Sequence, residues 1–132
     1  MATGPIRRVL VVDDERMVVE ALRRALRPHD VRVASSGRQA LEQLATESFD
    51  LIFCDLMMPD LTGMDVYDAL RAQHPGAEQR MVFMSGGTFT QRASEFLATV
   101  PNPLLDKPFD LAAVRQLVQA CSDDAALPRR AS

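Results

Sequence analysis

The stretch Leu51-Ile52-Phe53-Cys54-Asp55 consists of four apolar residues followed by a carboxylate. Its first four residues show no alternation of apolar and polar side chains, which is typical of a strand that is covered on both faces of a parallel sheet. Open parallel sheets bind ligands outside the carboxyl ends of their strands. We therefore expect a buried central strand over residues 51–54 that places Asp55 at the functional edge of the sheet.

Further apolar runs of strand length occur along the chain, and segments with helical periodicity separate them. Strands are expected over residues 6–12, 31–34, 51–54, 81–84 and 104–106. Helices are expected over residues 15–26, 37–46, 64–72, 89–100 and 111–120. Parallel strands need long right-handed crossovers, and these helices can supply them. The alternation predicts an α/β fold: a doubly wound, five-stranded parallel sheet with helices on both faces.

Local signals mark several helix ends. Ser36 and Asp110 each stand just before a predicted helix, where a side-chain oxygen can accept a hydrogen bond from a backbone N–H group. Thr62, followed by Asp65 three residues later, resembles a capping box. Pro28 is expected to end the first helix, because proline cannot continue the hydrogen-bond ladder.

The 132 residues are enough for one domain with its own core. We expect this domain over residues 1–122, with a core at about 6–120, and a tail or linker over 123–132, where periodicity is lost. A net charge of −3 argues against general binding to nucleic acid. No apolar run approaches the roughly 20 residues of a membrane helix. The distant Cys54 and Cys121 are expected to be reduced thiols in a cytoplasmic protein without membrane insertion.

Polar groups follow four of the predicted strands directly. These groups are Asp13-Asp14, Asp55, Ser85 and Lys107. Lys107 is the single lysine among fifteen Lys and Arg residues. An ammonium is a compact point charge, whereas a guanidinium is a planar fork, so lysine suits a site that holds one oxygen of a small anion. Because parallel strands share one carboxyl edge, we expect all these groups to lie together.

The carboxylates of Asp13, Asp14 and Asp55 would raise one another's pKa in such a cluster unless a cation neutralised them. Mg²⁺ prefers oxygen ligands and shares its shell with phosphate, so we expect a magnesium site. Lys107 and the Ser85 hydroxyl are then available for two phosphate oxygens. A carboxylate can attack phosphorus and form an acyl phosphate. Asp55 is the candidate nucleophile, because it stands alone after the central strand.

Four motifs stand in order at the ends of predicted strands: Val11-Val12-Asp13-Asp14-Glu15, Cys54-Asp55-Leu56-Met57-Met58-Pro59-Asp60, Met84-Ser85-Gly86 and Asp106-Lys107-Pro108-Phe109. Each motif is weak evidence alone, but the four in this order are specific. Together they resemble the receiver domain of response regulators in two-component signalling. The resemblance covers about residues 6–120.

The resemblance implies a flavodoxin-like fold with strand order 2-1-3-4-5. It implies that Asp55 accepts a phosphoryl group from the phosphohistidine of a histidine kinase or of a phosphotransfer domain. It also implies that Asp13 and Asp14 bind Mg²⁺ or Mn²⁺. Asp55 and the backbone carbonyl of Met57 are the further metal ligands that it implies.

Ser85 matches the hydroxyl switch residue of the family, and Lys107 matches the lysine that contacts the phosphoryl group. The backbone of Gly86 is expected on the phosphoryl side of the site. The resemblance thus implies a switch that changes conformation around Ser85 and the following helix, and a module of phosphoryl transfer rather than an enzyme. A downstream protein partner and a homodimer both stay open as the output.

One departure qualifies the resemblance, and one further likeness points to a sub-family. Leu104 stands three residues before Lys107, where the family often has Tyr or Phe, so the aromatic half of the usual switch is missing. The Ser85-Gly86-Gly87 start and the proline-flanked strand over residues 104–106 resemble receivers that are fused to hybrid histidine kinases.

Two other functions are alternatives to the switch. A phosphohydrolase of the haloacid-dehalogenase type also uses an Asp nucleophile, but it has a second acid two residues later, where this chain has Met57. A degenerate receiver that serves only for docking is expected to lose site residues, yet Asp13-Asp14, Asp55, Ser85 and Lys107 are all present. Both alternatives therefore fit the sequence less well.

Overall fold

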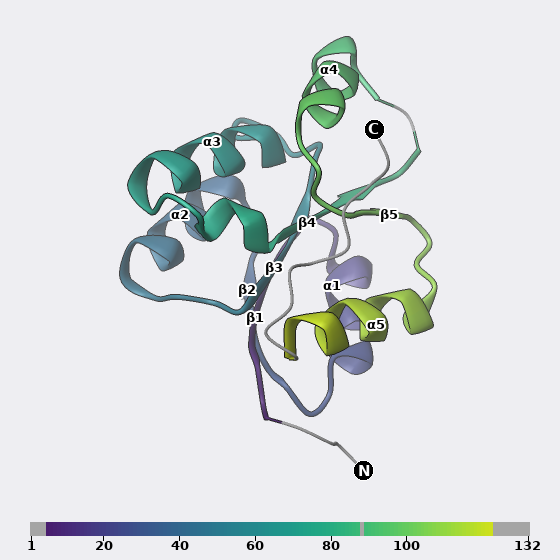
Figure 1. Cartoon of the computed structure of the whole chain (residues 1–132). Helices are drawn as coiled ribbons and strands as arrows, with labels where there is room; N and C mark the ends of the chain where they lie inside the picture. Colours follow the sequence, from purple (N-terminus) through teal and green to yellow (C-terminus); the bar gives the residue numbers. More distant parts are fainter. Residues whose placement is uncertain (1–4, 88, 123–132) are drawn as a thin grey trace.

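The computed structural model describes residues 5–87 and 89–122. Five strands alternate with five α-helices along this part of the chain (Figure 1). The strands are β1 (Arg8–Val12), β2 (Asp30–Ala34), β3 (Leu51–Asp55), β4 (Met81–Ser85) and β5 (Leu104–Asp106). The helices are α1 (Arg16–Ala25), α2 (Gly37–Thr46), α3 (Gly63–Gln73), α4 (Gln91–Thr99) and α5 (Leu111–Ser122), with a short 3-10 helix η1 (Ala77–Arg80). The predicted tail over 123–132 lies outside the described residues, so the domain boundary stays a prediction.

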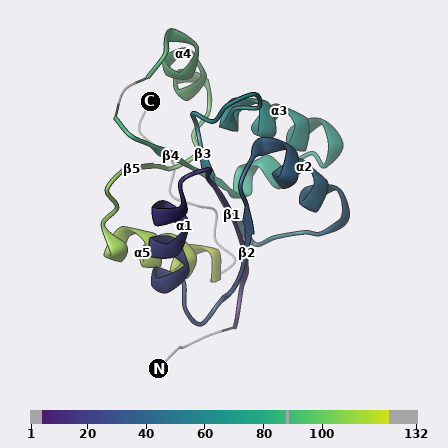
Figure 2. The same cartoon turned by 180° about the vertical axis from the view of Figure 1, so that it is seen from behind.

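All neighbouring strands run parallel, in the order β2-β1-β3-β4-β5. This arrangement confirms both the doubly wound five-stranded sheet and the strand order that the resemblance implied. Strand β3 lies at the centre, and all five of its residues are buried. Helices α2, α3 and α4 cover one face of the sheet, while α1 and α5 cover the other (Figures 1 and 2).

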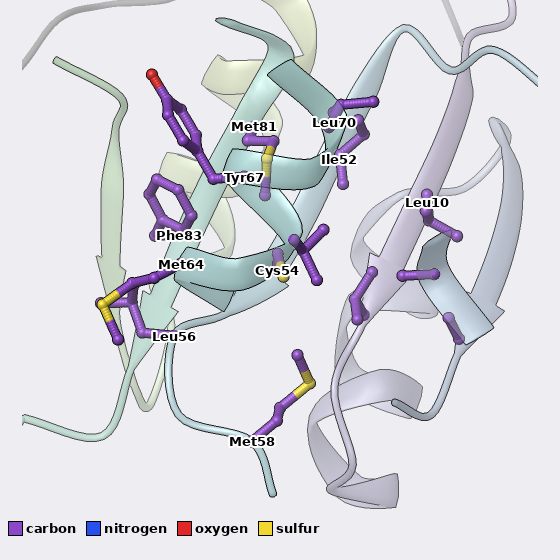
Figure 3. Packing of buried hydrophobic residues seen from close by; sticks show 14 of the residues in the cluster. Leu10, Ile52, Cys54, Leu56, Met58, Met64, Tyr67, Leu70, Met81 and Phe83 are labelled. Carbon is purple, nitrogen blue, oxygen red and sulfur yellow. The ribbon is translucent and has the colours of Figure 1, made fainter. Parts of the chain in front are cut away.

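The side chains of the strands divide between two apolar layers, because successive residues of a strand point to opposite faces. In β1, Leu10 and Val12 belong to the layer under α2, α3 and α4. Val9 and Val11 belong to the layer under α1 and α5. Figure 3 shows part of the first layer, in which side chains of α3 lie against those of the strands. Burial on both faces accounts for the absence of polar alternation in residues 51–54.

All three predicted capping signals are confirmed by hydrogen bonds, and Asp110 Oδ1 accepts from the backbone N–H of Ala112 at 3.0 Å at the start of α5. Ser36 Oγ accepts from the backbone N–H of Gln39 at 3.2 Å, at the start of α2. Thr62 and Asp65 form a complete capping box at the start of α3, with the Asp65 carboxylate accepting from the Thr62 backbone N–H at 2.9 Å. Such caps satisfy N–H groups that the helix itself leaves unpaired.

Several element boundaries differ from the prediction. Helix α4 begins at Gln91 rather than at residue 89, because Thr90 is its N-cap and accepts from the Ala93 N–H at 3.1 Å. Strand β1 begins at Arg8 rather than at residue 6. The 3-10 helix η1 was not predicted. Among the described helices, none has both the length and the apolar character needed to cross a membrane.

Gly63 lets helix α3 begin directly beside the end of β3. A Cβ atom at this position would lie 2.5 Å from the carbonyl oxygen of Asp55 and 3.0 Å from the Cα atom of Leu56. The Gly63 N–H donates to the carbonyl of Leu56 at 3.1 Å. Only glycine allows this close approach without a shift of the backbone. The loop that follows Asp55 is therefore held against the strand that carries it.

Candidate functional site

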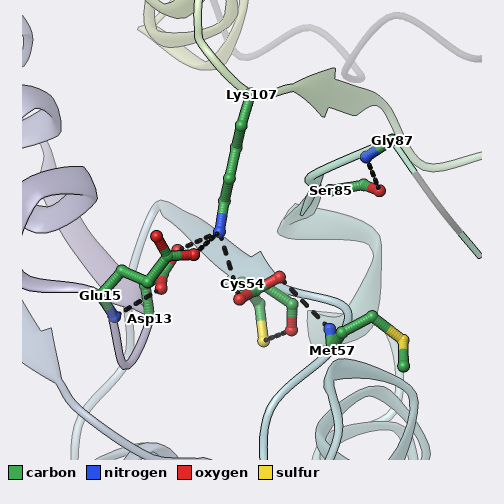
Figure 4. A network of polar contacts seen from close by, with 8 residues as sticks. Asp13, Glu15, Cys54, Met57, Ser85, Gly87 and Lys107 are labelled. Atoms are coloured by element: carbon green, nitrogen blue, oxygen red, sulfur yellow. Dashed lines mark hydrogen bonds and ion pairs between the residues drawn. The ribbon is translucent and has the colours of Figure 1, made fainter.

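The carboxyl edge of the sheet brings together side chains from four strand ends (Figure 4). Asp55 is the last residue of β3 and Ser85 is the last residue of the neighbouring β4. Lys107 follows β5 directly, and its backbone N–H donates to the Ser85 carbonyl at 2.8 Å. Asp13 follows β1 directly. These four placements confirm the convergence at one edge that the sequence predicted.

The ammonium of Lys107 lies among three carboxylates. Its Nζ atom is 3.0 Å from Asp13 Oδ2, 3.1 Å from Glu15 Oε1 and 3.2 Å from Asp55 Oδ2. Burial alone would disfavour the charged ammonium, but the hydrogen bonds and charges of the carboxylates outweigh it and raise the pKa of Lys107. Lys107 is therefore a permanent positive charge at this edge.

The two buried carboxyl groups resist ionisation. Burial, together with the negative charge of Asp13, raises the pKa of Asp55 to about 6. Lys107 and the Met57 backbone N–H, which donates to Asp55 Oδ1 at 3.2 Å, oppose that rise. Burial also raises the pKa of Asp13, although Asp13 Oδ1 accepts from the Glu15 backbone N–H at 2.8 Å. One ammonium thus compensates these two carboxylates only in part.

The donor set fits a hard divalent cation. Asp13 Oδ2 is buried and accepts no hydrogen bond of good geometry from the described residues. Carboxylate oxygens of Asp13, Glu15 and Asp55 all lie within 4.8 Å of one another. Mg²⁺ and Mn²⁺ prefer such oxygen ligands. The site can therefore accommodate the cation that the sequence predicted.

The third member of this carboxylate group is Glu15, whereas the sequence pointed to Asp14. Asp14 is exposed and is not one of the three residues whose oxygens cluster. Its role as a metal ligand, like that of the Met57 carbonyl, stays a prediction. The signal for Glu15 was present in the run Asp13-Asp14-Glu15, but sequence alone did not show that its side chain reaches Lys107.

The Ser85 side chain is fully buried, and its hydroxyl oxygen accepts a hydrogen bond from the Gly87 backbone N–H at 3.1 Å. This bond ties the hydroxyl to the loop that leads toward α4 (Figure 4). Leu104, at the position of the expected aromatic switch residue, is half-buried and packs against the apolar layer under α2, α3 and α4. The proposed phosphoryl-side role of the Gly86 backbone stays a prediction.

Helix α4 is attached to α3 at two points. The guanidinium of Arg92 lies 2.8 Å from Asp65 Oδ1, and Asp65 is also the acidic member of the α3 capping box. Phe96 makes edge-on ring contacts, with centroids 5.2 Å from Tyr67 and 5.3 Å from Phe83. Both contacts connect α4 to elements that flank the carboxyl edge.

Comparisons with known proteins point to one family. A model described as "Response regulator receiver domain" matches residues 9–119. The chain is 33% identical over 123 residues to "Response regulator MprA" of Mycolicibacterium vanbaalenii, covering 89% of this chain and 52% of that protein. It is 35% identical over 104 residues to "Transcriptional regulatory protein ZraR" of Escherichia coli, covering 77% of this chain and 23% of that protein. The chain thus spans about half or less of the length of these relatives.

Solved structures agree with this match. The receiver domain of Francisella response regulator 1452 has a TM-score of 0.74 and 26% identity, with 89% of this chain and 98% of that chain covered. A CheY-like receiver domain protein of Methanospirillum hungatei has a TM-score of 0.78 at 20% identity, with 91% and 96% covered, which supports the fold alone.

The raised pKa of Asp55 predicts a pH-dependent effect of Asp55→Asn on stability without divalent cations. Ionising a group whose folded pKa is near 6, against an ordinary value of 3.8, costs folding free energy above pH 6 and nothing below pH 3.8. Asp55→Asn should therefore raise the unfolding free energy at pH 7.5 by about 1–3 kcal/mol, and the gain should shrink as pH falls from 6 toward 4.

Denaturant unfolding of both proteins across this pH range measures the difference. Asp68→Asn, on the exposed face of α3, is a matched control for the loss of one carboxylate. A gain from Asp55→Asn that is the same at every pH would contradict the assigned pKa.

Proposed function

The chain belongs to the response regulator receiver domain family, and we propose that it is a phosphorylatable signalling switch with Asp55 as the acceptor. The phosphoryl donor in this proposal is the phosphohistidine of a histidine kinase or a phosphotransfer domain. The observation that carries the proposal is the position of Asp55, at the end of the central strand and 3.2 Å from the Lys107 ammonium. The buried Ser85 hydroxyl lies at the end of the neighbouring strand.

In the proposed transfer, one oxygen of the Asp55 carboxylate attacks phosphorus. The P–N bond of phosphohistidine breaks, its electron pair returns to the imidazole, and an acyl phosphate remains on Asp55. Lys107 contacts one phosphoryl oxygen and neutralises charge as the group arrives. The Ser85 hydroxyl donates to a second oxygen.

A divalent cation would neutralise further negative charge on the phosphoryl oxygens. We propose that Asp13 and Asp55 hold Mg²⁺ or Mn²⁺, together with Asp14 and the backbone carbonyl of Met57. The buried Asp13 Oδ2 atom, which lacks a well-formed hydrogen bond, supports a cation beside it.

The proposed signal leaves the site through Ser85. We propose that the Ser85 side chain turns toward the phosphoryl group to donate its own proton, which moves the oxygen to which the Gly87 N–H now donates. That turn disturbs the loop between β4 and α4, whereas Leu104 has no ring or hydroxyl with which to follow. The expected response is therefore centred on this loop and α4, where the Arg92–Asp65 ion pair is exposed enough to rearrange.

The output stays a proposal, because the chain spans only part of its regulatory relatives. A downstream protein partner or a homodimer would receive the signal. The relatives are named as response regulators and transcriptional regulators, and none of these names mentions a hybrid histidine kinase. Fusion to such a kinase therefore stays a prediction. The cytoplasmic location also stays a prediction. We propose a module of phosphoryl transfer rather than a phosphatase.

Phosphoryl uptake is the test of the acceptor. Incubated with acetyl phosphate and Mg²⁺, the wild-type protein should gain the mass of one phosphoryl group, and chelation of Mg²⁺ should prevent most of the gain. Asp55→Asn should abolish uptake, because the amide is nearly isosteric with the carboxylate but is not a nucleophile. Intact-protein mass spectrometry measures both, with Asp68→Asn as the control for a lost surface carboxylate. Equal labelling of Asp55→Asn would refute the assignment.

The conformational response can be located by amide hydrogen exchange with and without beryllofluoride, a phosphoryl mimic, in the presence of Mg²⁺. We expect exchange to change several-fold in the loop after Ser85 and in α4, and little in α1. Ser85→Ala should bind the mimic but lose most of this change, because it lacks the hydroxyl that turns. A change confined to α1 would contradict the proposed route.

A further inference from the structure

The Lys107 ammonium is surrounded by three carboxylates in the resting site, with hydrogen bonds to Glu15 and Asp55 and an ion pair with Asp13. A lysine carries three N–H donors, and three carboxylates lie 3.0–3.2 Å from Nζ (Figure 4). A phosphoryl group on Asp55 needs one of these donors. Asp55 passes its own contact to the phosphoryl oxygens when it becomes an acyl phosphate, and these oxygens add negative charge beside Asp13 and Glu15, the two carboxylates that still contact Lys107.

Exposure decides which of the two remaining carboxylates, Asp13 or Glu15, can move away from Lys107. The side chain of Asp13 is 0% exposed and that of Asp55 is 6% exposed, whereas that of Glu15 is 61% exposed. A buried carboxylate that loses its cation keeps an uncompensated charge in a medium of low dielectric constant, which is strongly unfavourable. An exposed carboxylate loses little, because water solvates it instead. Glu15 is the partner that can be released.

The side chain and backbone of Glu15 act separately. Glu15 stands at the N-cap of α1, but its side chain makes no capping hydrogen bond. Its backbone N–H donates to Asp13 Oδ1 at 2.8 Å and helps to position that carboxylate. The side chain has the contact with Lys107 at 3.1 Å. A change of side chain can therefore remove the ion pair and leave the backbone hydrogen bond in place.

We propose that Glu15 is a positioning residue that competes with the phosphoryl group for Lys107. In the resting protein its carboxylate accepts a hydrogen bond from Lys107, and on phosphorylation the new negative charge on Asp55 drives it into solvent. Glu15 also adds negative charge beside the cation site, since its oxygen lies within 4.8 Å of those of Asp13 and Asp55. Its charge therefore favours the cation and opposes the phosphoryl group. This inference rests on the proposed function.

The substitution Glu15→Gln separates these two effects. Titration calorimetry with Mg²⁺ alone should show binding weakened by roughly two- to five-fold, the range expected for one exposed charge. At saturating Mg²⁺, beryllofluoride should bind roughly two- to five-fold more tightly than to wild type, because no carboxylate has to be displaced. Glu20→Gln removes the same charge from an exposed position on α1 and should change neither value by much.

Lys107 also provides a direct readout. Because it is the single lysine of this chain, nitrogen-labelled lysine introduces one ammonium Nζ signal into the NMR spectrum. The resting signals of wild type and Glu15→Gln should differ, since one has the ion pair and the other does not. With Mg²⁺ and beryllofluoride bound, the two signals should converge, because Glu15 has left in the wild type.

Weaker or unchanged binding of beryllofluoride to Glu15→Gln at saturating Mg²⁺ would overturn the competition. Signals that remain different in the bound state would overturn the release of Glu15. A wild-type protein whose Lys107 signal ignores Mg²⁺ and beryllofluoride would instead overturn the proposed function, and this proposal with it.

Discussion

The site depends on one balance of charge, in which the Lys107 ammonium holds carboxylates that would otherwise repel one another. Asp13 and Asp55 are both buried, and burial raises the pKa of each. A single positive charge 3.0 Å and 3.2 Å from their oxygens compensates them in part. The remaining negative charge leaves the site ready for a cation, and the cation and Lys107 together make it ready for a phosphoryl group.

The fold supplies this balance through parallel strands that end at one edge. Asp55 is at the end of strand β3, and Ser85 is at the end of its neighbour β4. The backbone N–H of Lys107 donates a hydrogen bond to the Ser85 carbonyl. Gly63 allows α3 to start against the carbonyl of Asp55. The acceptor is thus held between a rigid strand and a fixed loop, whereas Glu15 is the exposed one of the three carboxylates that contact the ammonium in the described part of the chain. Asp55 is therefore the fixed part of the site, and the Glu15 side chain is the part that can move.

Local signals predicted most of the fold, and tertiary contacts account for what was missed. The apolar run over residues 51–54 predicted the central strand, because a strand that is buried on both faces consists of apolar residues without polar alternation. The capping box of Thr62 and Asp65 was readable because its partners are three residues apart. The Glu15 contact was not readable, since Lys107 lies 92 residues away and an exposed side chain has no sequence signature for its partner. The strand order came from the family resemblance.

The titration of the Asp55 carboxyl group, followed by carbon NMR without divalent cations, tests the charge balance most directly. In the wild-type protein this pKa should lie near 6. In Lys107→Met, where a side chain of similar length has no charge, the pKa of Asp55 should be higher, because the ammonium that lowers it has been removed. An Asp55 pKa that stays the same after removal of the ammonium would contradict the central role of Lys107.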